Sequence, residues 1–246
     1  MQRLMMIAPD CTFSATKNMS KNEFIETVQR DTELCSRLST NLSIYMDKVR
    51  TYVRNLPQTC SEIDPGSLMI DGRYTHEDHL RIRLSFLHFL LSEGQLWLMT
   101  PQANELWDAL VVNAVFEFER TYGFQLFASM QEQEDIDPKA LDPFFETRIL
   151  KLPVDLLNEE GFSCFKTFWT AVNKLAGKLV QPPSSIHFLL NSFDLEGHDY
   201  LWEIILKARD NVSRRATELW VDIFSNPHAD MVSDVGQLNE FVINKW

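Results

Sequence analysis

Apolar side chains recur at every third or fourth position between residues 42 and 56, and no other feature of the chain constrains its fold as strongly. The positions are Leu42, Tyr45, Met46, Val49, Tyr52, Val53 and Leu56. Because residues at this spacing share one face of an α-helix, the segment is expected to be an amphipathic helix that ends before Pro57. Its apolar face requires a second element to pack against.

Capping signals mark the starts of further helices. Ser20 and Glu23 form an S-x-x-E capping box, with Met19 and Phe24 at the two positions of a hydrophobic staple. Thr75 is the expected N-cap of a later helix. Two dipeptides, Thr100-Pro101 and Asp137-Pro138, each place a capping side chain before a proline at the first helical position.

The helix expected over residues 77–98 is apolar on two faces. One stripe holds Leu80, Leu84, Leu87 and Leu91, and the other holds Ile82, Phe86, Phe89 and Leu90. A helix of this kind has to be covered on two sides, which is typical of the inner layer of stacked helices. The acidic stretch QEQEDID at 131–137 is expected to be an exposed connection.

The last third of the chain shows the same helical patterns. A helix is expected over 158–179, followed by a loop around Pro182-Pro183 and two more helices, the last of which ends at Asn226-Pro227. The final helix carries the stripe Val212, Ala216, Leu219, Trp220 and Ile223. A short phrase recurs as ELWDALVVN at 105, YLWEIILKA at 200 and ELWVDIFSN at 218, which favours equivalent core positions on degenerate helical repeats over a ligand cage.

Composition favours the same class of fold. The 246 residues are 45% hydrophobic and include only 8 Gly and 10 Pro, which favours long helices around a continuous core over a turn-rich β-sandwich. Residues 1–18 form a poorly specified lead-in, and residues 19–246 form one helical region with loops at 57–74 and 180–193. We therefore predict an all-α fold of about eight to ten helices.

The charge balance argues against nucleic acid and membranes as partners. The chain has 35 Asp and Glu against 23 Lys and Arg, and a formal charge of -12 repels phosphate backbones and anionic lipids. Every apolar run is far shorter than the roughly 20 residues of a membrane span. The first residues, MQRLMMIAPDC, are too weakly apolar for a signal peptide. We expect protein partners in the cytoplasm, with the nucleus as an additional location.

The cysteines indicate neither a metal site nor an activated nucleophile. Cys11, Cys35, Cys60 and Cys164 are scattered without a C-x-x-C pair, so reduced and packed thiols are expected. Cys164 lies among phenylalanines in GFSCFKTFW, where burial would raise the pKa of the thiol and disfavour the thiolate. We predict no catalytic residue, no cofactor and no metal site in this chain.

The histidines also lack a catalytic spacing. His76 and His79 are three residues apart, whereas a helical zinc protease needs H-E-x-x-H, so both are expected at a helix N-terminus. His88 falls within the Leu80–Leu91 stripe, where a hydrogen-bonded core histidine is expected. Three others, His187, His198 and His228, lie in or beside loops. The phosphate-binding motifs G-x-x-x-x-G-K-[ST] and G-x-G-x-x-G and the nucleophile motif G-x-S-x-G do not occur in the sequence.

Three stretches resemble one known family: EDHLRIRLSFLHFLLSEGQLWL, EEGFSCFKTFWTAVNKLAGKL and FDLEGHDYLWEIILKARDNVSRRATEL. They are similar to the non-catalytic armadillo-type region of the giant fat-facets-type ubiquitin-specific proteases, and the similarity covers residues 76–226. The third stretch is the most specific, with Gly197, Asp199, Tyr200, Leu201 and Trp202 in order. Glu196 and His198 stand where aliphatic residues are expected, which indicates a divergent member or an exposed turn.

The resemblance implies an armadillo/HEAT-like helical solenoid over residues 19–246 and a parent protein that removes ubiquitin from its substrates. The cysteine box of the family, an N-x-G-N-T-C-like text, and its G-H-Y-like histidine box do not occur here, so no catalytic residue is carried over. The segment itself is expected to be a scaffold and a surface for protein partners, ubiquitinated or not. The terminal segment GQLNEFVINKW is apolar, whereas the end of a solenoid needs a polar cap. We therefore expect that the native chain continues past Trp246 or that another element covers this end.

Two alternatives stay open at the level of sequence. A free-standing helical adaptor without the protease would have the same fold. An independent cysteine hydrolase would need Cys164, a loop histidine and an orienting group to meet in space.

Overall fold

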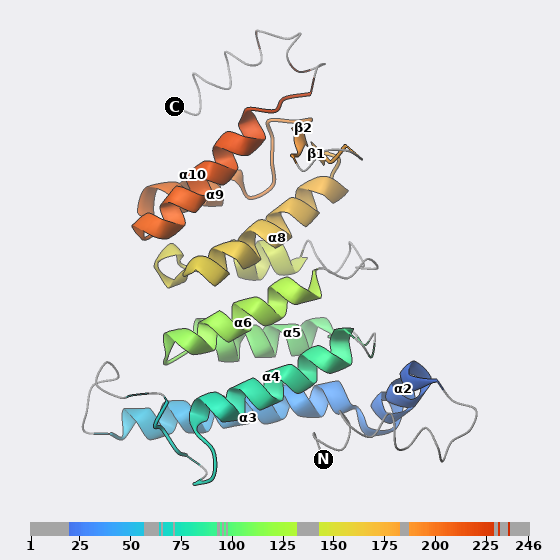
Figure 1. Cartoon of the computed structure of the whole chain (residues 1–246), viewed down its shortest axis with the longest axis vertical. Helices are drawn as coiled ribbons and strands as arrows, with labels where there is room; N and C mark the ends of the chain where they lie inside the picture. Colours follow the sequence, from blue (N-terminus) through green and yellow to red (C-terminus); the bar gives the residue numbers. More distant parts are fainter. Residues whose placement is uncertain are drawn as a thin grey trace. The chain divides into compact units, whose positions relative to one another are not determined.

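The computed structural model describes residues 20–56, 64, 66–70, 72–92, 94, 96, 98–131, 143–182, 187–228, 231 and 236. Most of these residues are helical, as Figure 1 shows, which confirms the all-α class. The chain divides into two compact units, Met1–Gln133 and Glu134–Trp246, which are taken in turn below. A two-stranded β-pair in the second unit is the one sheet within these ranges.

The first unit begins with α2 (Lys21–Thr32) and α3 (Leu34–Arg54). The capping box at Ser20 is confirmed: its Oγ accepts from the Glu23 N–H at 3.3 Å, and its own N–H donates to the Glu23 carboxylate at 2.6 Å. Glu33 separates the two helices with a φ of 51°. The predicted stripe of α3 is largely confirmed, since Leu42, Tyr45, Met46, Val49 and Val53 are buried and only Tyr52 is well exposed.

Two helical hairpins follow one another in this unit. The first pairs α3 with α4 (His76–Ser92). The second pairs α5 (Thr100–Trp107), which continues as the π-helical turn η2 (Asp108–Val112), with α6 (Glu117–Met130). Thr75 caps α4 as predicted, because its Oγ1 accepts from the Asp78 N–H at 3.2 Å. The start of α5 at Thr100 is confirmed, but the cap bond there joins the Met99 N–H to the Gln102 side chain at 3.0 Å.

Equivalent helices of the two hairpins run parallel. Side-chain hydrogen bonds join α4 to α6 at His76–Glu119, Glu77–Tyr122 and His88–Ser129, so residue numbers rise together along both helices. The bonds Thr40–Glu105 and Arg50–Asn113 relate α3 to α5 and its continuation in the same way. Figure 1 shows α4 and α6 on the near side, with α3 and α5 behind them. One hairpin therefore repeats the other after a translation, as in a helical solenoid.

Two details of α4 differ from the prediction. The helix ends at Ser92 and does not reach residue 98. A Cβ at Gly94 would lie 2.4 Å from the Leu90 carbonyl oxygen, so the backbone has turned tightly against the last helical turn. Ile82, which was placed in the second apolar stripe, is 42% exposed, whereas Phe86 and Leu90 of that stripe are buried.

The second unit contains the π-helical turn η3 (Phe145–Ile149), the short 3-10 helix η4 (Val154–Leu156), α8 (Glu159–Leu175), α9 (His198–Lys207) and α10 (Asp210–Phe224). Asn158 caps α8 by accepting from the Gly161 N–H at 2.8 Å. The bonds Asn211–Glu159 and Arg215–Ser163 show that α8 and α10 also run parallel. Ring contacts at Trp202–Trp220 and His198–Phe224 show that α9 and α10 are antiparallel.

The segment 180–193 was predicted as a loop, and it includes part of a small β-pair. Strand β1 (Leu179–Val180) pairs antiparallel with β2 (Leu189–Leu190), and Leu190 also forms a bridge with Pro227 just after α10. Two residues in a strand leave too short an alternation for a sequence pattern to detect. The predictions that lie wholly or partly outside the described residues include the lead-in at 1–18, the Met19 staple, the loop at 57–74, the Asp137-Pro138 start, most of 131–137, the loop around Pro182-Pro183 and the terminal GQLNEFVINKW.

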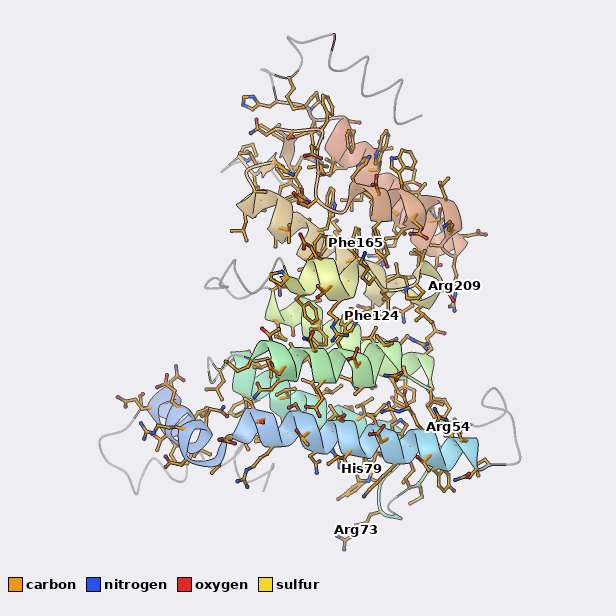
Figure 2. The ribbon with its side chains drawn as sticks, turned by 180° about the vertical axis from the view of Figure 1, so that it is seen from behind. Arg54, Arg73, His79, Phe124, Phe165 and Arg209 are labelled. Atoms are coloured by element: carbon orange, nitrogen blue, oxygen red, sulfur yellow. The ribbon has the colours of Figure 1, made fainter. Side chains whose placement is uncertain are left out.

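The Leu-Trp phrases were predicted to occupy the core, and this is confirmed for their leucines but only in part for their tryptophans, since Trp202 and Trp220 are half-buried. Leu106, Leu201 and Leu219 are each at most 5% exposed. Trp107 is also fully buried, and its ring packs edge-on against Phe124 and Phe127. Figure 2 labels Phe124 among the helices of the first unit, and it shows Arg73 projecting away from them.

Candidate interaction surface

Neither of the two described cysteines is placed to act as a nucleophile. Cys35 and Cys164 are free thiols, and both are 0% exposed. Burial raises the pKa of Cys35 to about 11 and raises the pKa of Cys164 further. The thiolate that a cysteine enzyme needs is therefore disfavoured at both positions, as predicted for Cys164. Cys11 and Cys60 lie outside the described residues.

His76 lies in a buried polar cluster of the first unit. Its Nε2 is 2.7 Å from Oε1 of Glu119, and its Nδ1 is 3.0 Å from the hydroxyl of Tyr45. The side chains of His76 and Glu119 are both 0% exposed. A histidine and carboxylate in contact can orient a general base, but this pair is enclosed by packed helices that leave no room for a substrate.

The other histidines make separate contacts. His79 lies in the first turn of α4, as predicted, with its Nδ1 2.9 Å from Arg83. The prediction that His88 belongs to the core is wrong: His88 is exposed, at the edge of the α4 stripe, and its Nδ1 lies 3.2 Å from the Ser129 hydroxyl of α6. Three contacts lie in the second unit: His187 with Asp222 at 2.8 Å, His198 with the ring of Phe224, and the His228 N–H with the Leu190 carbonyl.

The described ranges hold no group of three or more His, Cys, Asp or Glu side chains with the geometry of a metal site. Those ranges also hold no helix that is long and apolar enough to cross a bilayer.

The parallel helices α4 and α6 border a groove of about 350 Å³, here called the α4/α6 groove. Its lining consists of Arg81, Leu84, Ser85, His88, Tyr122, Gln125, Leu126 and Ser129. Leu84 and Leu126 form its floor and are only 7% and 5% exposed. Every other lining side chain carries a hydrogen-bonding group, so an apolar floor is flanked by two polar rims.

Charges at the amino end of the α4/α6 groove are already paired. The Tyr122 hydroxyl donates to Glu77 at 2.8 Å, and partial burial, together with this carboxylate, raises the pKa of Tyr122. Arg81 forms an ion pair with Asp78 at 2.6 Å. The rest of the rim consists of uncharged groups on Ser85, Gln125 and Ser129 together with His88. This combination can hydrogen-bond a polypeptide backbone while the floor accepts an apolar side chain.

A second hollow, of about 630 Å³, lies in the second unit before and along α9. Four carboxylates line it, those of Asp194, Glu196, Asp199 and Glu203, together with apolar side chains that include Leu150 and Phe193. Lys178 lies 2.7 Å from Glu196 and 3.6 Å from Asp194, and chiefly the hydrogen bond to Glu196 raises the pKa of Lys178. The unexpected Glu196 therefore sits in an exposed, ion-paired turn, whereas His198 is 5% exposed and packs among aromatic rings.

The α4/α6 groove was not predicted from the sequence. Leu84 was correctly predicted on an apolar stripe, but His88 was assigned to the same stripe. Tyr122, Gln125 and Ser129 recur at helical spacing on α6, and this polar stripe was the available signal.

Comparison with known proteins gives one consistent family. The family described as "UBP24/USP9X/USP9Y ARM repeat" matches residues 1–173, so its match includes the N-terminal residues that precede the resemblance at 76–226. Ubiquitin carboxyl-terminal hydrolase 9X of Mus musculus is 34% identical over 226 residues, which is 92% of this chain and 8% of that protein. Probable ubiquitin carboxyl-terminal hydrolase FAF of Drosophila melanogaster is 34% identical over 246 residues, 96% of this chain and 9% of that protein.

A further relative, ubiquitin carboxyl-terminal hydrolase 24 of Homo sapiens, is 31% identical over 159 residues, which is 64% of this chain and 6% of that protein. The chain thus spans less than a tenth of the length of each of these relatives. By its family match over residues 1–173 and its stacked helical hairpins, the chain belongs to the UBP24/USP9X/USP9Y ARM repeat family.

Proposed function

We propose that this chain is a non-catalytic helical scaffold and protein-interaction segment of a large ubiquitin-specific protease. The parent protein would remove ubiquitin from substrate proteins, with its catalytic residues in another domain. Membership of the ARM repeat family supports this proposal, as do the names of the relatives, each of which contains the term ubiquitin carboxyl-terminal hydrolase. We place the segment in the cytoplasm, and also in the nucleus where its parent occurs there.

The α4/α6 groove is the observation that carries the proposed role in protein binding. Parallel stacking of α4 on α6 leaves a lateral surface to which both helices contribute side chains. Stacked hairpins bury their core between neighbours, so such faces remain open to partners. We therefore assign protein partners to this segment, either substrates or adaptor proteins, with or without attached ubiquitin.

A site-specific photo-crosslinking experiment tests this role. A photoreactive residue replaces Gln125, which lines the α4/α6 groove, or Thr217, an exposed position on α10 that serves as the matched control. The expected result is a defined protein adduct from position 125 that position 217 does not give. Blotting the adduct for ubiquitin then separates a ubiquitinated substrate from an unmodified adaptor.

A blocking variant shows whether the groove itself is responsible. Ser85→Arg adds a large side chain to the opposite rim, and because Ser85 is exposed this change is expected to alter stability by no more than about 0.5 kcal/mol. The adduct at position 125 should then be lost while the thermal unfolding midpoint is kept. An adduct that persists in Ser85→Arg, or that forms equally from position 217, argues against the groove.

The free-standing adaptor is the alternative within the same fold. It would bind proteins through the same surface, but its messenger RNA would not encode the cysteine and histidine boxes of a protease. Sequencing the complete transcript separates the two possibilities. An independent hydrolase is disfavoured by the burial of Cys164 and the pKa elevation of its thiol.

A further inference from the structure

Glu119 of α6 makes hydrogen bonds within its own helix start and to the neighbouring hairpin. Its Oε2 accepts from the Val115 N–H at 2.6 Å and from the Phe116 N–H at 3.3 Å, just before α6 begins. Its Oε1 lies 2.7 Å from Nε2 of His76, the first residue of α4. The Glu119 carboxylate thus caps α6 in the second hairpin and also forms a hydrogen bond with His76 in the first hairpin.

The chain of contacts continues from His76 to α3. A carboxylate can only accept hydrogen bonds, so Nε2–H of His76 donates to Glu119, while Nδ1 lies 3.0 Å from the Tyr45 hydroxyl. The His76 backbone N–H also donates to the Leu68 carbonyl at 2.7 Å. Tyr45, His76 and Glu119 therefore form a hydrogen-bonded relay across α3, α4 and α6, here called the buried relay.

The surroundings of the buried relay leave it almost no contact with bulk water. His76 and Glu119 are 0% exposed and Tyr45 is 3% exposed. The imidazole packs against the rings of Phe116 and Phe118, with centroid separations of 6.0 and 5.3 Å. On its other side Tyr45 lies under the guanidinium of Arg83 at 4.4 Å and beside the ring of His79.

From this geometry we infer that the buried relay makes the first turn of α6 conditional on the docking of α4. A buried carboxylate that loses one of its hydrogen-bond donors destabilises the fold, because its desolvation is no longer fully compensated. Without His76, the least costly way to rehydrate Glu119 is to open the α6 start that encloses it. This contact would then contribute to the coupling between repeats that stabilises solenoids.

Because coupling free energies are reciprocal, a change in either hairpin should be felt in the other. Hydrogen exchange of the full 246-residue chain, read by mass spectrometry over peptides, measures this directly. His76→Phe keeps a ring of similar shape and removes both nitrogens. The expected result is a loss of roughly tenfold or more in the protection of amides at 115–121, which are remote in sequence from the substitution.

A rescue and a control separate the buried relay from general damage. His76→Gln retains a side-chain N–H that can reach Glu119, so protection at 115–121 should partly return. Glu117→Gln removes an exposed carboxylate in the same first turn of α6, and this change should leave protection at 72–84 within about twofold, the effect of a surface substitution. Glu119→Gln, by contrast, should reduce protection at 72–84 across the hairpins.

Several outcomes would overturn the inference. Unchanged exchange at 115–121 in His76→Phe would show that the cap of α6 holds by itself. An equal loss of protection in α8, in the second unit, would show global destabilisation with no local coupling. If His76→Phe does not fold, the same experiment is done with Tyr45→Phe, which removes one hydroxyl from the buried relay. A loss of exchange protection confined to 72–84 and 115–121 in this variant supports the coupling. Unchanged protection in both segments contradicts it.

Discussion

The hydroxyl of Tyr200 on α9 donates a hydrogen bond to the carbonyl oxygen of Leu152 at a distance of 2.7 Å. Leu152 lies in the connection between η3 and η4, so this bond fastens α9 to a segment without long helices of its own. The ring of Tyr200 is 8% exposed and packs against Phe165 of α8. A single side chain thus joins three parts of the second unit.

Removing this hydroxyl leaves the Leu152 carbonyl without its side-chain donor. We expect Tyr200→Phe to lower the free energy of unfolding by about 1 to 3 kcal/mol, the cost of an unsatisfied buried group. Urea denaturation followed by circular dichroism checks this. Tyr52→Phe is the matched control, because Tyr52 is 42% exposed and its variant should fall within about 0.5 kcal/mol of wild type.

Because the pKa of Tyr200 is shifted, we also expect the free energy of unfolding to fall under alkaline conditions. Burial raises the pKa of Tyr200, and the carboxylates of Glu203 and Asp155 add to the shift. The folded pKa therefore exceeds the unfolded value of about 10, so the contribution of Tyr200 is complete below about pH 10 and is lost as pH rises through the folded value. The unfolding free energy of the wild type should fall more steeply above about pH 10 than that of Tyr200→Phe. Parallel slopes in urea titrations across this range would refute the assignment.

Two glycines with positive φ allow backbone strain to be separated from crowding. Gly197 and Gly177 have φ of 70° and 68°. A Cβ at 197 would lie 2.9 Å from Cζ of Phe145 and 3.0 Å from Leu150, whereas a Cβ at 177 meets nothing within 4 Å. Gly177→Ala should cost about 1 kcal/mol of backbone strain, and Gly197→Ala should cost about 1 to 3 kcal/mol more through overpacking. Equal unfolding midpoints for the two variants would contradict the close packing at 197.

The sequence was sufficient to predict most of the helices because their signals are local. The Ser20 capping box, the Thr75 cap and the stripe of α3 each depend on residues within a few turns. Glu33 shows the limit: it interrupts α2 and α3 with φ of 51°, although glutamate is not a residue that favours this conformation. Local hydrogen bonds hold this break: the Glu33 N–H donates to the Gln29 carbonyl at 2.8 Å, and the Cys35 N–H donates to the Gln29 side chain at 2.8 Å.

The candidate groove was harder to predict, because its two rims come from different helices. His88 is four residues after Leu84, which is the spacing of the apolar stripe. In the structure, however, His88 lies on the edge of α4 that faces α6, beside Ser129. The Tyr45–His76–Glu119 relay spans residues 31 and 43 positions apart in the sequence. Such contacts depend on how the hairpins stack, and helical periodicity within one segment carries no information about that.

The two described thiols should be inert in the folded chain. In a Cys11→Ser, Cys60→Ser background, the remaining cysteines are Cys35 and Cys164, both 0% exposed with raised pKa values. A water-soluble disulfide reagent near pH 7 should therefore modify neither thiol within the time in which it modifies both in concentrated urea. Rapid native labelling, followed by peptide mapping to Cys164, would show that α8 opens far more readily than its packing implies.

The most direct measurement is incubation of the purified chain with a ubiquitin-derived thiol-reactive probe. No covalent adduct is expected, because Cys35 and Cys164 are buried thiols and the chain belongs to an ARM repeat family. A catalytically competent ubiquitin-specific protease labelled in parallel confirms that the probe is active. A stoichiometric adduct that disappears in Cys164→Ala would contradict the non-catalytic scaffold role and establish a cysteine hydrolase in this chain.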